Sequence, residues 1–537
     1  MANTFKKAID RQMWVQVAPT PNIHAAGVSL ATDLRNSDAR NPNVYQLVSN
    51  TVLNRYNIKQ KAWNFIVSPA LTTTFGAGAG CVFAPSANVR GSIGAGCSTT
   101  SIVTKTNQTA VGVNMLANRG GAGDHGFRVR IIGNAAGSSG KIEERWIVGN
   151  TGGATPTLLL DEALTFTPAD NDTYEILSGS VYMLGAAALA AGSWRSFEVA
   201  TNTLTTRTQT NLPATVGTDF SGLALDEQYV PYDREPGEGF VVGAGTYNGA
   251  ALKCLTATNS ASGTLTGQAS AGDAGVLQNE YRNFQIRIVE DTAIPTAVNQ
   301  RRIIASHTAG ASPVYTLGAA WAVTPSTTAK YVIEYPNLIL VWSSATAVTY
   351  TYNYTPAAIN NGTNSINADA FHVTYFGNRG GNMGAGCTSF PSFGIEPDAA
   401  KNARHSFIFS FRGGGASTLD MLDIAGGTTG AWTATLVYDG AITLSTGSCG
   451  KYAPSCQEGR FGYINSYVAS QVNQIYRFDV KNRVLTPVTA TDWIQAGTAA
   501  AGDRMATYVA IDGTDKYTVV LLVSHTSTVA QELVVQI

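Results

Sequence analysis

The chain has 537 residues, a formal net charge of -1 and only 13% charged residues. Soluble domains average about 25%, and the even balance leaves no basic footprint for sequence-specific nucleic-acid binding or for an anionic membrane surface. The 55 glycines, with abundant Thr, Ala, Ser and Asn, indicate short strands joined by turns, and therefore an all-β protein. No apolar stretch reaches the roughly eighteen residues of a membrane span.

Residues 1–43 are predicted to form an N-terminal arm, suited to reach a neighbouring subunit, and a clasp strand. The segment from Trp14 to Val17 has the pattern of an outer strand, but no hairpin precedes it to supply a partner. At the other end, residues 503–537 offer three strands and no fourth. Because an unpaired sheet edge is a liability, we expect the N-terminal strand to complete the C-terminal sheet.

One short pattern recurs five times between the two ends: an aromatic or apolar residue, then Asn, Asp or Glu, then a spacer and a large apolar residue. Each copy follows a run of apolar or alternating residues, so it predicts a strand, a tight polar turn and a second strand. The spacer has five residues in the first four copies and is longer in the last. The copies are Tyr56-Asn57 with Trp63, Phe197-Glu198 with Leu204, Tyr352-Asn353 with Ile359, Phe478-Asp479 with Leu485, and Leu422-Asp423 with Trp432.

This pattern resembles the repeat of the kelch family, in which a strand, a Gly-Gly pair and a strand ending in Tyr-Asp precede a Trp that opens the outer strand. Phe407 to Gly414, followed by Thr418 to Asp423 and Trp432, show nearly the whole repeat, while the other copies lack the diglycine. The resemblance implies a β-propeller with the recurring pattern in the inner half of each blade. Counting the hairpins predicts a six-bladed β-propeller closed by the N-terminal strand.

Residues 127–177 align without a gap to residues 284–334, at a constant offset of 157 and with sixteen identical positions. Both segments alternate short strands with Gly, Thr, Ala and Pro turns, so each predicts a small β module. We interpret them as two related β-module insertions into the second and third blades. The predicted organisation is arm and clasp strand (1–43), propeller blades (44–96), first inserted module (97–178), blades (179–254), second inserted module (255–335), and blades with closure (336–537).

The sequence offers no recognisable catalytic or metal-binding constellation. The six histidines are scattered, and the six cysteines lack the paired spacing of a zinc site. Cys81, Cys97 and Cys387 each close a Gly-Ala-Gly-Cys tetrapeptide and are expected to be buried free thiols, whereas Cys449 and Cys456 could form a disulfide. We therefore predict no catalytic, cofactor-binding or metal-binding residue and no cofactor, and we expect that the chain is not an enzyme.

Carboxylates are the remaining candidates, since a glycoside hydrolase needs two of them across a cleft. Five of these acids lie within residues 226–238, which we interpret as a solvated loop or a subunit contact. The basic pair Arg301-Arg302 and the basic cluster of Lys6, Lys7 and Arg11 are each interpreted as part of a solvated face. The Asp-box of sialidase-type propellers is absent. The candidate acids are Asp161, Glu162, Asp226, Glu227, Asp233, Glu235 and Glu238.

The modules themselves, with Arg145 to Thr151 leading into Leu158 to Pro168 and Tyr174 to Ile176, resemble the small β modules of structural proteins in tailed bacteriophages. Short-tailed phages also build tail nozzles from hexamers of propeller subunits. These resemblances imply a structural virion protein, a nozzle- or collar-like ring component of the tail or neck. Its partners would be further copies of itself, expected as a hexamer, and other phage tail or neck proteins, and it would be made in the host cytoplasm.

Two other classes stay open at this point. A receptor- or glycan-binding propeller of a phage spike or fibre, with or without glycan cleavage, would expose aromatic residues around one mouth of the ring, and the candidates are Tyr229, Tyr232, Tyr247 and Tyr452. A kelch adaptor of the cytoplasm would usually carry a helical recruiting domain, for which the blades and insertions leave little room.

Overall fold

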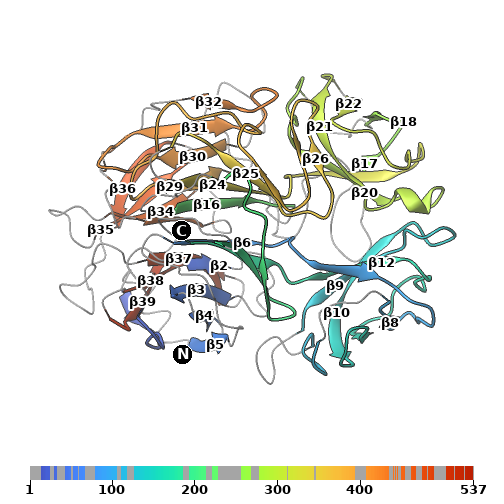
Figure 1. Ribbon diagram of the computed structural model, residues 1–537, viewed down its shortest axis with the longest axis horizontal. Helices are drawn as coiled ribbons and strands as arrows, with labels where there is room; N and C mark the ends of the chain where they lie inside the picture. The colour runs from blue at the N-terminus through green and yellow to red at the C-terminus, as the bar shows by residue number, and fades with distance from the viewer. Residues whose placement is uncertain are drawn as a thin grey trace.

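The computed structural model is all-β, and within its described residues no α-helix occurs and only one short 3-10 helix, η1 (Pro295–Ala297) (Figure 1). The structure describes residues 14–23, 30–32, 43–49, 52–58, 60–66, 79–105, 111–117, 126–185, 193–212, 220–227, 255–267, 277–310, 312–343, 346–392, 407–433, 440, 442, 444, 449–453, 461–466, 474–480, 482–488, 504–512, 515–524 and 527–535.

Six four-stranded antiparallel sheets, numbered I to VI along the chain, form the body of the described structure. Sheet I holds β2 (Leu30–Thr32), β3 (Asn43–Ser49), β4 (Val52–Asn57) and β5 (Ala62–Ile66); sheet II holds β6 (Gly80–Ala84), β13 (Ser180–Leu184), β14 (Trp194–Glu198) and β15 (Thr203–Thr206); sheet III holds β16 (Phe220–Leu225), β24 (Leu338–Ser343), β25 (Tyr350–Asn353) and β28 (Ala370–His372). Sheet IV holds β29 (Thr388–Ser392), β30 (Phe407–Phe411), β31 (Leu419–Asp423) and β32 (Ala431–Thr433); sheet V holds β33 (Cys449–Ala453), β34 (Phe461–Ser466), β35 (Gln474–Asp479) and β36 (Val484–Val488); sheet VI holds β37 (Arg504–Asp512), β38 (Asp515–Val523), β39 (Ala530–Val535) and β1 (Trp14–Gln16).

The first strand of each sheet is the one that meets its neighbours. In chain order β2 contacts β6, β6 contacts β16, β16 contacts β29, β29 contacts β33, β33 contacts β37, and β37 contacts β2 again. The recurring pattern of the sequence joins the third and fourth strands of a sheet, which lie away from these contacts. Its predicted place in the inner half of each blade was therefore wrong, because the spacing defines a hairpin and does not say which hairpin of the sheet it is.

Four of the five recurring pairs face each other across a turn, as in Tyr56 with Trp63 and Phe478 with Leu485; the others are Phe197 with Leu204 and Leu422 with Trp432. The prediction was wrong for Tyr352, which pairs with Phe371. A hairpin of β26 (Ile359–Asn360) and β27 (Ser365–Ile366) intervenes.

Asn353 directs the chain into that hairpin. Its Nδ2 donates to the backbone oxygens of Ala357, Ile366 and Asn367 at 2.8, 3.2 and 3.1 Å. The buried Asn353 amide thus binds the chain just before β26 and at the end of β27. The next strand of sheet III is therefore β28.

The terminal strands pair as the sequence predicted. β1 runs antiparallel to β39, with Trp14 opposite Leu533 and Gln16 opposite Gln531. The C-terminal sheet therefore gains its fourth strand from the N-terminal segment, and the edge of β39 is covered.

A buried carboxylate joins the same sheet to sheet I. Glu532 of β39 accepts hydrogen bonds from the hydroxyls of Tyr56, at 2.7 Å, and Tyr508, and from Lys61 Nζ at 2.7 Å. All three donors share the Glu532 carboxylate as their acceptor. Sheets I and VI are therefore joined by side-chain hydrogen bonds as well as by packing.

Two larger sheets interrupt the body. The first module lies between β6 and β13 and has the strand order β7-β12-β9-β10-β11-β8; the second lies between β16 and β24 and has the order β17-β23-β20-β21-β22-β19-β18. The first consists of β7 (Val89–Ser92), β8 (Ser101–Val103), β9 (Arg128–Ile132), β10 (Ile142–Asn150), β11 (Thr157–Leu160) and β12 (Thr173–Leu177). The second consists of β17 (Leu255–Thr256), β18 (Asn259–Ala261), β19 (Thr264–Thr266), β20 (Gln285–Glu290), β21 (Arg301–His307), β22 (Val314–Leu317) and β23 (Lys330–Glu334).

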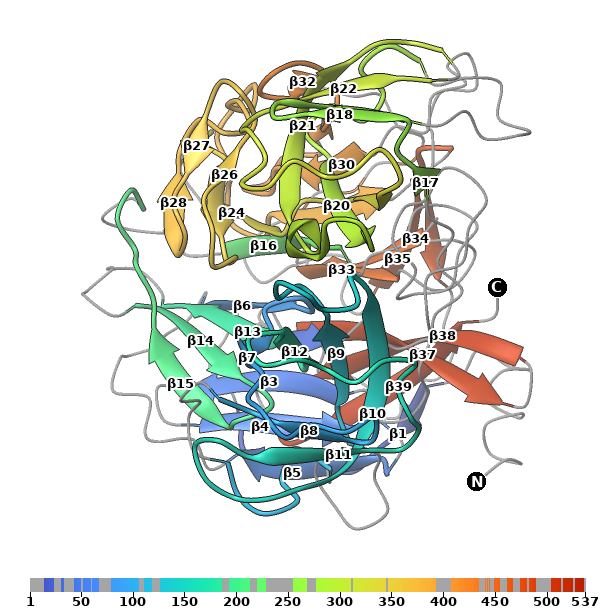
Figure 2. The ribbon, with the colours of Figure 1, turned by 90° about the vertical axis from the view of Figure 1, so that its right-hand side faces the viewer.

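The two modules share one strand order, with only β18 added to the second, and they share local detail. The β-bulge between Ile147 and Gly149 recurs between Ile304 and Ser306, at the offset of the repeat. The sheet of the first module already includes β7, before the boundary expected at residue 97. Both modules lie on the same side of the molecule, at the right in Figure 1 and toward the viewer in Figure 2.

Candidate site between the two modules

A row of alternating charges crosses four strands of the first module. Arg90, Glu175, Arg130 and Glu144 occupy directly opposed positions on β7, β12, β9 and β10. Glu175 accepts from Arg90 Nε at 2.9 Å and from Arg130 Nη1 at 3.1 Å, and Arg130 Nε donates to Glu144 at 2.9 Å. Opposite charges on facing strands attract, and here the middle pair is almost completely buried.

Glu227, two residues after β16, extends this row to the second module. Its carboxylate accepts from Arg130 Nη1 at 2.9 Å, from Arg301 Nε at 3.0 Å and from Asn337 Nδ2 at 2.8 Å. The Glu227 side chain is fully buried. One carboxylate therefore binds the first module, the second module and sheet III together.

The repeat explains why the two modules are complementary. Arg130 has its counterpart in Arg287, which donates to Glu334 at 3.0 Å within the second module. The counterpart of Glu144, however, is Arg301, so the charge at this position is reversed. The reversal lets Arg301 reach across to the first module, where its Nη2 lies 3.6 Å from Glu175.

The surrounding guanidinium groups keep these carboxylates ionised. Burial by itself would raise the pKa of Glu175, but the charges of Arg90, Arg301 and Arg130 outweigh it and hold that pKa well below its ordinary value. Burial also raises the pKa of Glu227, but the charges of neighbouring arginines, first of all Arg301, outweigh this effect. They hold the pKa of Glu227 well below its ordinary value. Neither group is protonated near neutral pH, so neither is suited to act as a general acid.

Asp226 and Glu227 do not form the solvated loop that the sequence suggested. Asp226 is buried and accepts from the backbone N–H of Ser86 at 2.8 Å, from the Ser86 hydroxyl at 2.7 Å and from the Tyr354 hydroxyl at 2.5 Å. Both residues leave the end of β16 directly into the junction, where donors from five separate segments of the chain meet them. The interpretation as a solvated loop was therefore wrong for these two acids.

The other sequence candidates lie elsewhere. In the turn that follows β11, Asp161 accepts the N–H of Trp146 at 2.9 Å, and Glu162 is exposed. Outside the described residues are the acids Asp233, Glu235 and Glu238, the tyrosines Tyr229, Tyr232 and Tyr247, and the cluster of Lys6, Lys7 and Arg11. The exposure of the Tyr452 side chain also lies outside the description.

The pair Arg301-Arg302 divides between two tasks. Arg301 belongs to the buried network, so its interpretation as part of a solvated face was wrong. Arg302 donates to the backbone oxygen of Ala320 at 2.7 Å and lies over the Trp321 ring. Its counterpart Arg145 binds an equivalent backbone oxygen in the first module, so this arginine closes a turn in both copies.

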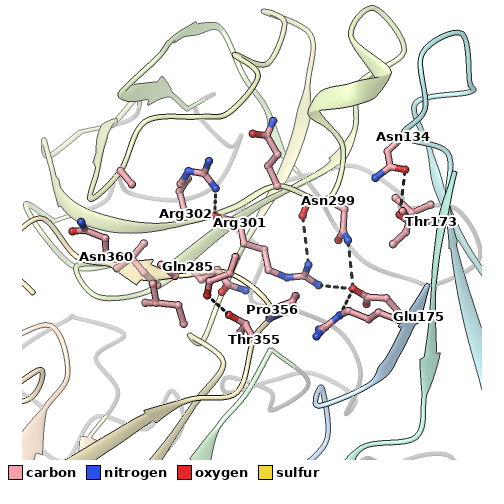
Figure 3. Close-up of a pocket in the computed structure, with 18 of the residues that line it drawn as sticks. Asn134, Thr173, Glu175, Gln285, Asn299, Arg301, Arg302, Thr355, Pro356 and Asn360 are labelled. Carbon is pink, nitrogen blue, oxygen red and sulfur yellow. Dashed lines mark hydrogen bonds and ion pairs between the residues drawn. The ribbon is translucent and has the colours of Figure 1, made fainter. Parts of the chain in front are cut away.

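A hollow of about 640 Å³ opens beside the network, between the two modules and residues 355–360. Figure 3 shows Asn134 and Thr173 on one wall and Asn299 and Arg302 on the other, with Glu175 at the base. The Asn299 Oδ1 atom is buried without a hydrogen-bond partner. Amide and guanidinium groups around such a hollow suit a small polar ligand.

Cys81 and Cys387 are buried, as predicted, whereas the prediction was wrong for Cys97, which is half-buried. The suggested disulfide partner Cys456 lies outside the described residues. In the described part of the chain no group of three His, Cys, Asp or Glu side chains is arranged to hold a metal ion. No helix there is long and apolar enough to cross a membrane.

Comparisons with known proteins give no assignment. No family model matches the chain, and no curated protein matches it. Among solved structures, the NanB sialidase from Streptococcus pneumoniae, in complex with 2-[(3-chlorobenzyl)ammonio]ethanesulfonate, aligns over 98% of this chain and 94% of its own with 6% identity and a TM-score of 0.15. A likeness of that size carries no argument about fold or function.

Proposed function

We propose that this chain is a structural virion protein of a tailed bacteriophage, a nozzle- or collar-like ring component of the tail or neck that acts by subunit assembly. One observation carries the proposal: two copies of the same β module are fixed side by side by a buried network of Arg and Glu side chains. The resemblance of the module sequence to small β modules of phage structural proteins supplies the biological setting.

The network makes the pair of modules a rigid unit. Removing one partner from a buried ion pair costs about 3–5 kcal/mol because the other charge is left without compensation. Glu227 has partners in both modules and in sheet III, so separating the modules would strand several charges at once. Two similar surfaces held at a fixed angle suit contacts that repeat around a symmetric assembly.

The body that carries the modules is proposed to be a closed six-bladed β-propeller. The cyclic contacts among the first strands of the six sheets support closure, as does the pairing of β1 with β39. In a closed ring the sheet edges are short and protected. A body of this kind can pack against neighbouring subunits without exposing unpaired strand edges.

The low charge of the chain favours burial between subunits. With only 13% charged residues, a Thr-, Ala- and Gly-rich face loses little solvation when another protein covers it. The buried carboxylates Asp226 and Glu227 each accept several hydrogen bonds. Their role is therefore structural, because they hold neighbouring segments together.

Quantitative mass spectrometry of purified source particles tests the proposal. We expect this chain at about six or twelve copies per particle, a number that follows from ring symmetry, and no turnover when the purified protein meets bacterial polysaccharides. Its absence from particles, or a monomer that depolymerises a bacterial glycan, would contradict the assignment.

A receptor- or glycan-binding propeller of a spike or fibre is the second candidate, and the hollow beside Glu175 is the observation that favours it. Amide side chains are among its lining residues, and amides can bind the hydroxyl groups of a sugar; they are Asn134, Gln285, Asn299, Gln300 and Asn360. Calorimetric titration with host surface glycans would decide between them. Binding that Asn299→Ala abolishes would favour the receptor role, and the absence of binding would favour the assembly role.

A further inference from the structure

We propose that the hollow between the two modules binds a small hydroxylated carboxylate, the chemical class of a uronic acid residue in a glycan. Its carboxylate pairs with Arg302, and one of its hydroxyl groups donates to Asn299. Both side chains line the hollow on the wall of the second module (Figure 3). The inference rests on the receptor- or glycan-binding candidate, because it names the ligand class of that same hollow.

Three consecutive residues at the hollow break the repeat between the modules. Residues 142–144, with the sequence Ile-Glu-Glu, correspond to residues 299–301, with the sequence Asn-Gln-Arg. Two carboxylates are thereby replaced by an amide and a guanidinium, and all three residues of the second module line the hollow. The ion pair with Glu227 explains Arg301, but the junction does not explain the two amides.

The exchange of Glu143 for Gln300 leaves Arg302 without a counter-charge. In the first module, Arg145 Nη2 donates to Glu143 at 2.9 Å. Arg302 is the counterpart of Arg145, and among the described residues its guanidinium donates only to backbone oxygens. Its Nη2 atom makes no hydrogen bond there, so this edge of the guanidinium is available to an anion.

Gln300 does not replace the missing carboxylate, because its own hydrogen bonds occupy it. Its Oε1 accepts the N–H groups of Ala322 and Val323 at 2.8 and 3.0 Å. Its Nε2 donates to the backbone oxygens of Ala297 and Val323 at 3.1 and 2.7 Å. Burial lowers the pKa of Arg302, but a guanidinium stays charged at neutral pH. The second module therefore presents an uncompensated cation to the hollow.

The charges of the lining favour a ligand with a single negative charge. Arg90 and Arg301 have carboxylate partners in Glu175 and Glu227, whereas Arg302 has no ion pair among the described residues. A carboxylate matches this one surplus charge and fits the planar edge of a guanidinium. A phosphate dianion brings a second negative charge close to Glu175, and like charges repel at short range.

Asn299 offers the ligand a second, uncharged contact. Its Oδ1 atom is buried and has no hydrogen-bond partner among the described residues, while its Nδ2 lies 3.4 Å from Glu175 Oε1. An amide oxygen only accepts hydrogen bonds, so this atom suits a hydroxyl group and not a carboxylate. A buried acceptor without a donor costs free energy, which a donating hydroxyl recovers.

The size and the apolar part of the lining fit a sugar ring. The hollow measures about 640 Å³, and sites for small molecules span roughly 300–1,000 Å³. Pro356, Ala358 and Ile359 are among its lining residues and can contact the C–H groups of a ring. A uronic acid combines a carboxylate, several hydroxyl groups and an apolar ring face in one small molecule.

Calorimetric titration of the full chain with D-glucuronate, and with D-glucose as its neutral counterpart, tests the inference. We expect glucuronate to bind with a dissociation constant of about 1 mM or lower. Glucose, which lacks the charged group for Arg302, should bind about tenfold more weakly. Glucose 6-phosphate is the dianionic comparison, and it should also bind more weakly than glucuronate.

The variant Gln300→Glu restores the carboxylate that the first module has at this position. It should neutralise Arg302 and weaken glucuronate binding about tenfold or more. The matched control Thr316→Glu adds the same charge at an exposed position of β22, outside the lining, and is expected to bind as the unmodified chain does. Asn299→Gly removes the amide but tolerates the positive φ of 68°, because glycine adopts such angles without strain, and it should weaken the binding of both sugars.

Thermal unfolding of each variant shows whether the fold is kept, and the comparison of sugars on the unmodified chain still decides if Gln300→Glu does not fold. Four results would each overturn the inference: no binding of glucuronate up to about 20 mM, equal binding of glucuronate and glucose, tighter binding of glucose 6-phosphate, or a folded Gln300→Glu variant that binds like the unmodified chain. Equal binding of the two sugars would still support a glycan-binding role. Glucuronate binding by a chain that binds no host surface glycan would contradict only the receptor role.

Discussion

Replacing His307 by Asn should remove an acid-sensitive contact from the second module. His307 Nε2 accepts the N–H of Tyr281 at 2.8 Å, and its Nδ1 lies 2.9 Å from the Thr308 backbone oxygen. The ring must therefore be neutral, with its proton on Nδ1. In the first module the equivalent residue is Asn150, whose Oδ1 accepts the N–H of Leu116 at 2.9 Å.

The magnitude follows from the shift in pKa. Burial between Tyr281 and Tyr315 lowers the pKa of His307 below its ordinary value of about 6.5. The unfolded chain then binds the proton more readily than the folded one. The stabilisation from neutral His307 is complete above about pH 7 and is lost as the pH falls below about 6.5, by up to about 1.4 kcal/mol per pH unit until the folded pKa is reached.

We expect His307→Asn to cost about 1–2 kcal/mol at pH 8, because the smaller side chain leaves space between two rings, but to flatten the loss of stability toward pH 5. Hydrogen exchange of residues 277–310 at pH 5, 6, 7 and 8 reads this locally. His372, whose pKa burial also lowers, is present in both proteins, so their difference isolates His307. Equal acid sensitivity of the two proteins would refute the reasoning.

Three further changes probe the junction and the closure. Glu227→Gln should lower the free energy of unfolding by about 3–5 kcal/mol. The control Asp170→Asn, which breaks an exposed ion pair with Lys105, should lower it by less than about 1 kcal/mol. Denaturant titration measures both variants, and equal effects would contradict the stabilising role of the buried network. Deleting residues 1–20 should expose the edge of β39 and cause aggregation visible by light scattering, and a truncated chain that melts as cooperatively as the full one would disprove the clasp. Glu532→Gln should lower the melting temperature because Lys61 loses its buried counter-charge, whereas an unchanged melting temperature would argue against the tie between sheets I and VI.

Much of the strand architecture could be predicted from the sequence because local patterns of residues specify it. An aromatic residue, a polar turn and an apolar residue at a set distance predict a hairpin, and Tyr56 with Trp63 or Phe478 with Leu485 face each other as that spacing requires. The same spacing failed at Tyr352, since Asn353 turns the chain into an extra hairpin through bonds to distant backbone oxygens. A local pattern cannot report such a detour.

The junction was missed for a different reason. Arg90, Arg130, Glu175, Glu227 and Arg301 come from five separate segments, and only the fold brings them into one network. One signal was available: Arg130 and Arg287 are identical in the two copies and stand among buried strand residues. A charge kept at such a position needs a buried partner.

The identities and the differences of the repeat carry separate information. Shared residues such as Arg145 and Arg302, which close the same turn in both copies, define the module. The changed positions define its surroundings: Arg301 in place of Glu144 makes one module the ionic partner of the other. Ala305 in place of Val148 lies where the turn between β26 and β27 comes close to the second copy, whereas Val148 is exposed. A duplicated module diverges where its neighbours differ, so the positions that break the repeat are the ones where further contacts of this chain should be sought.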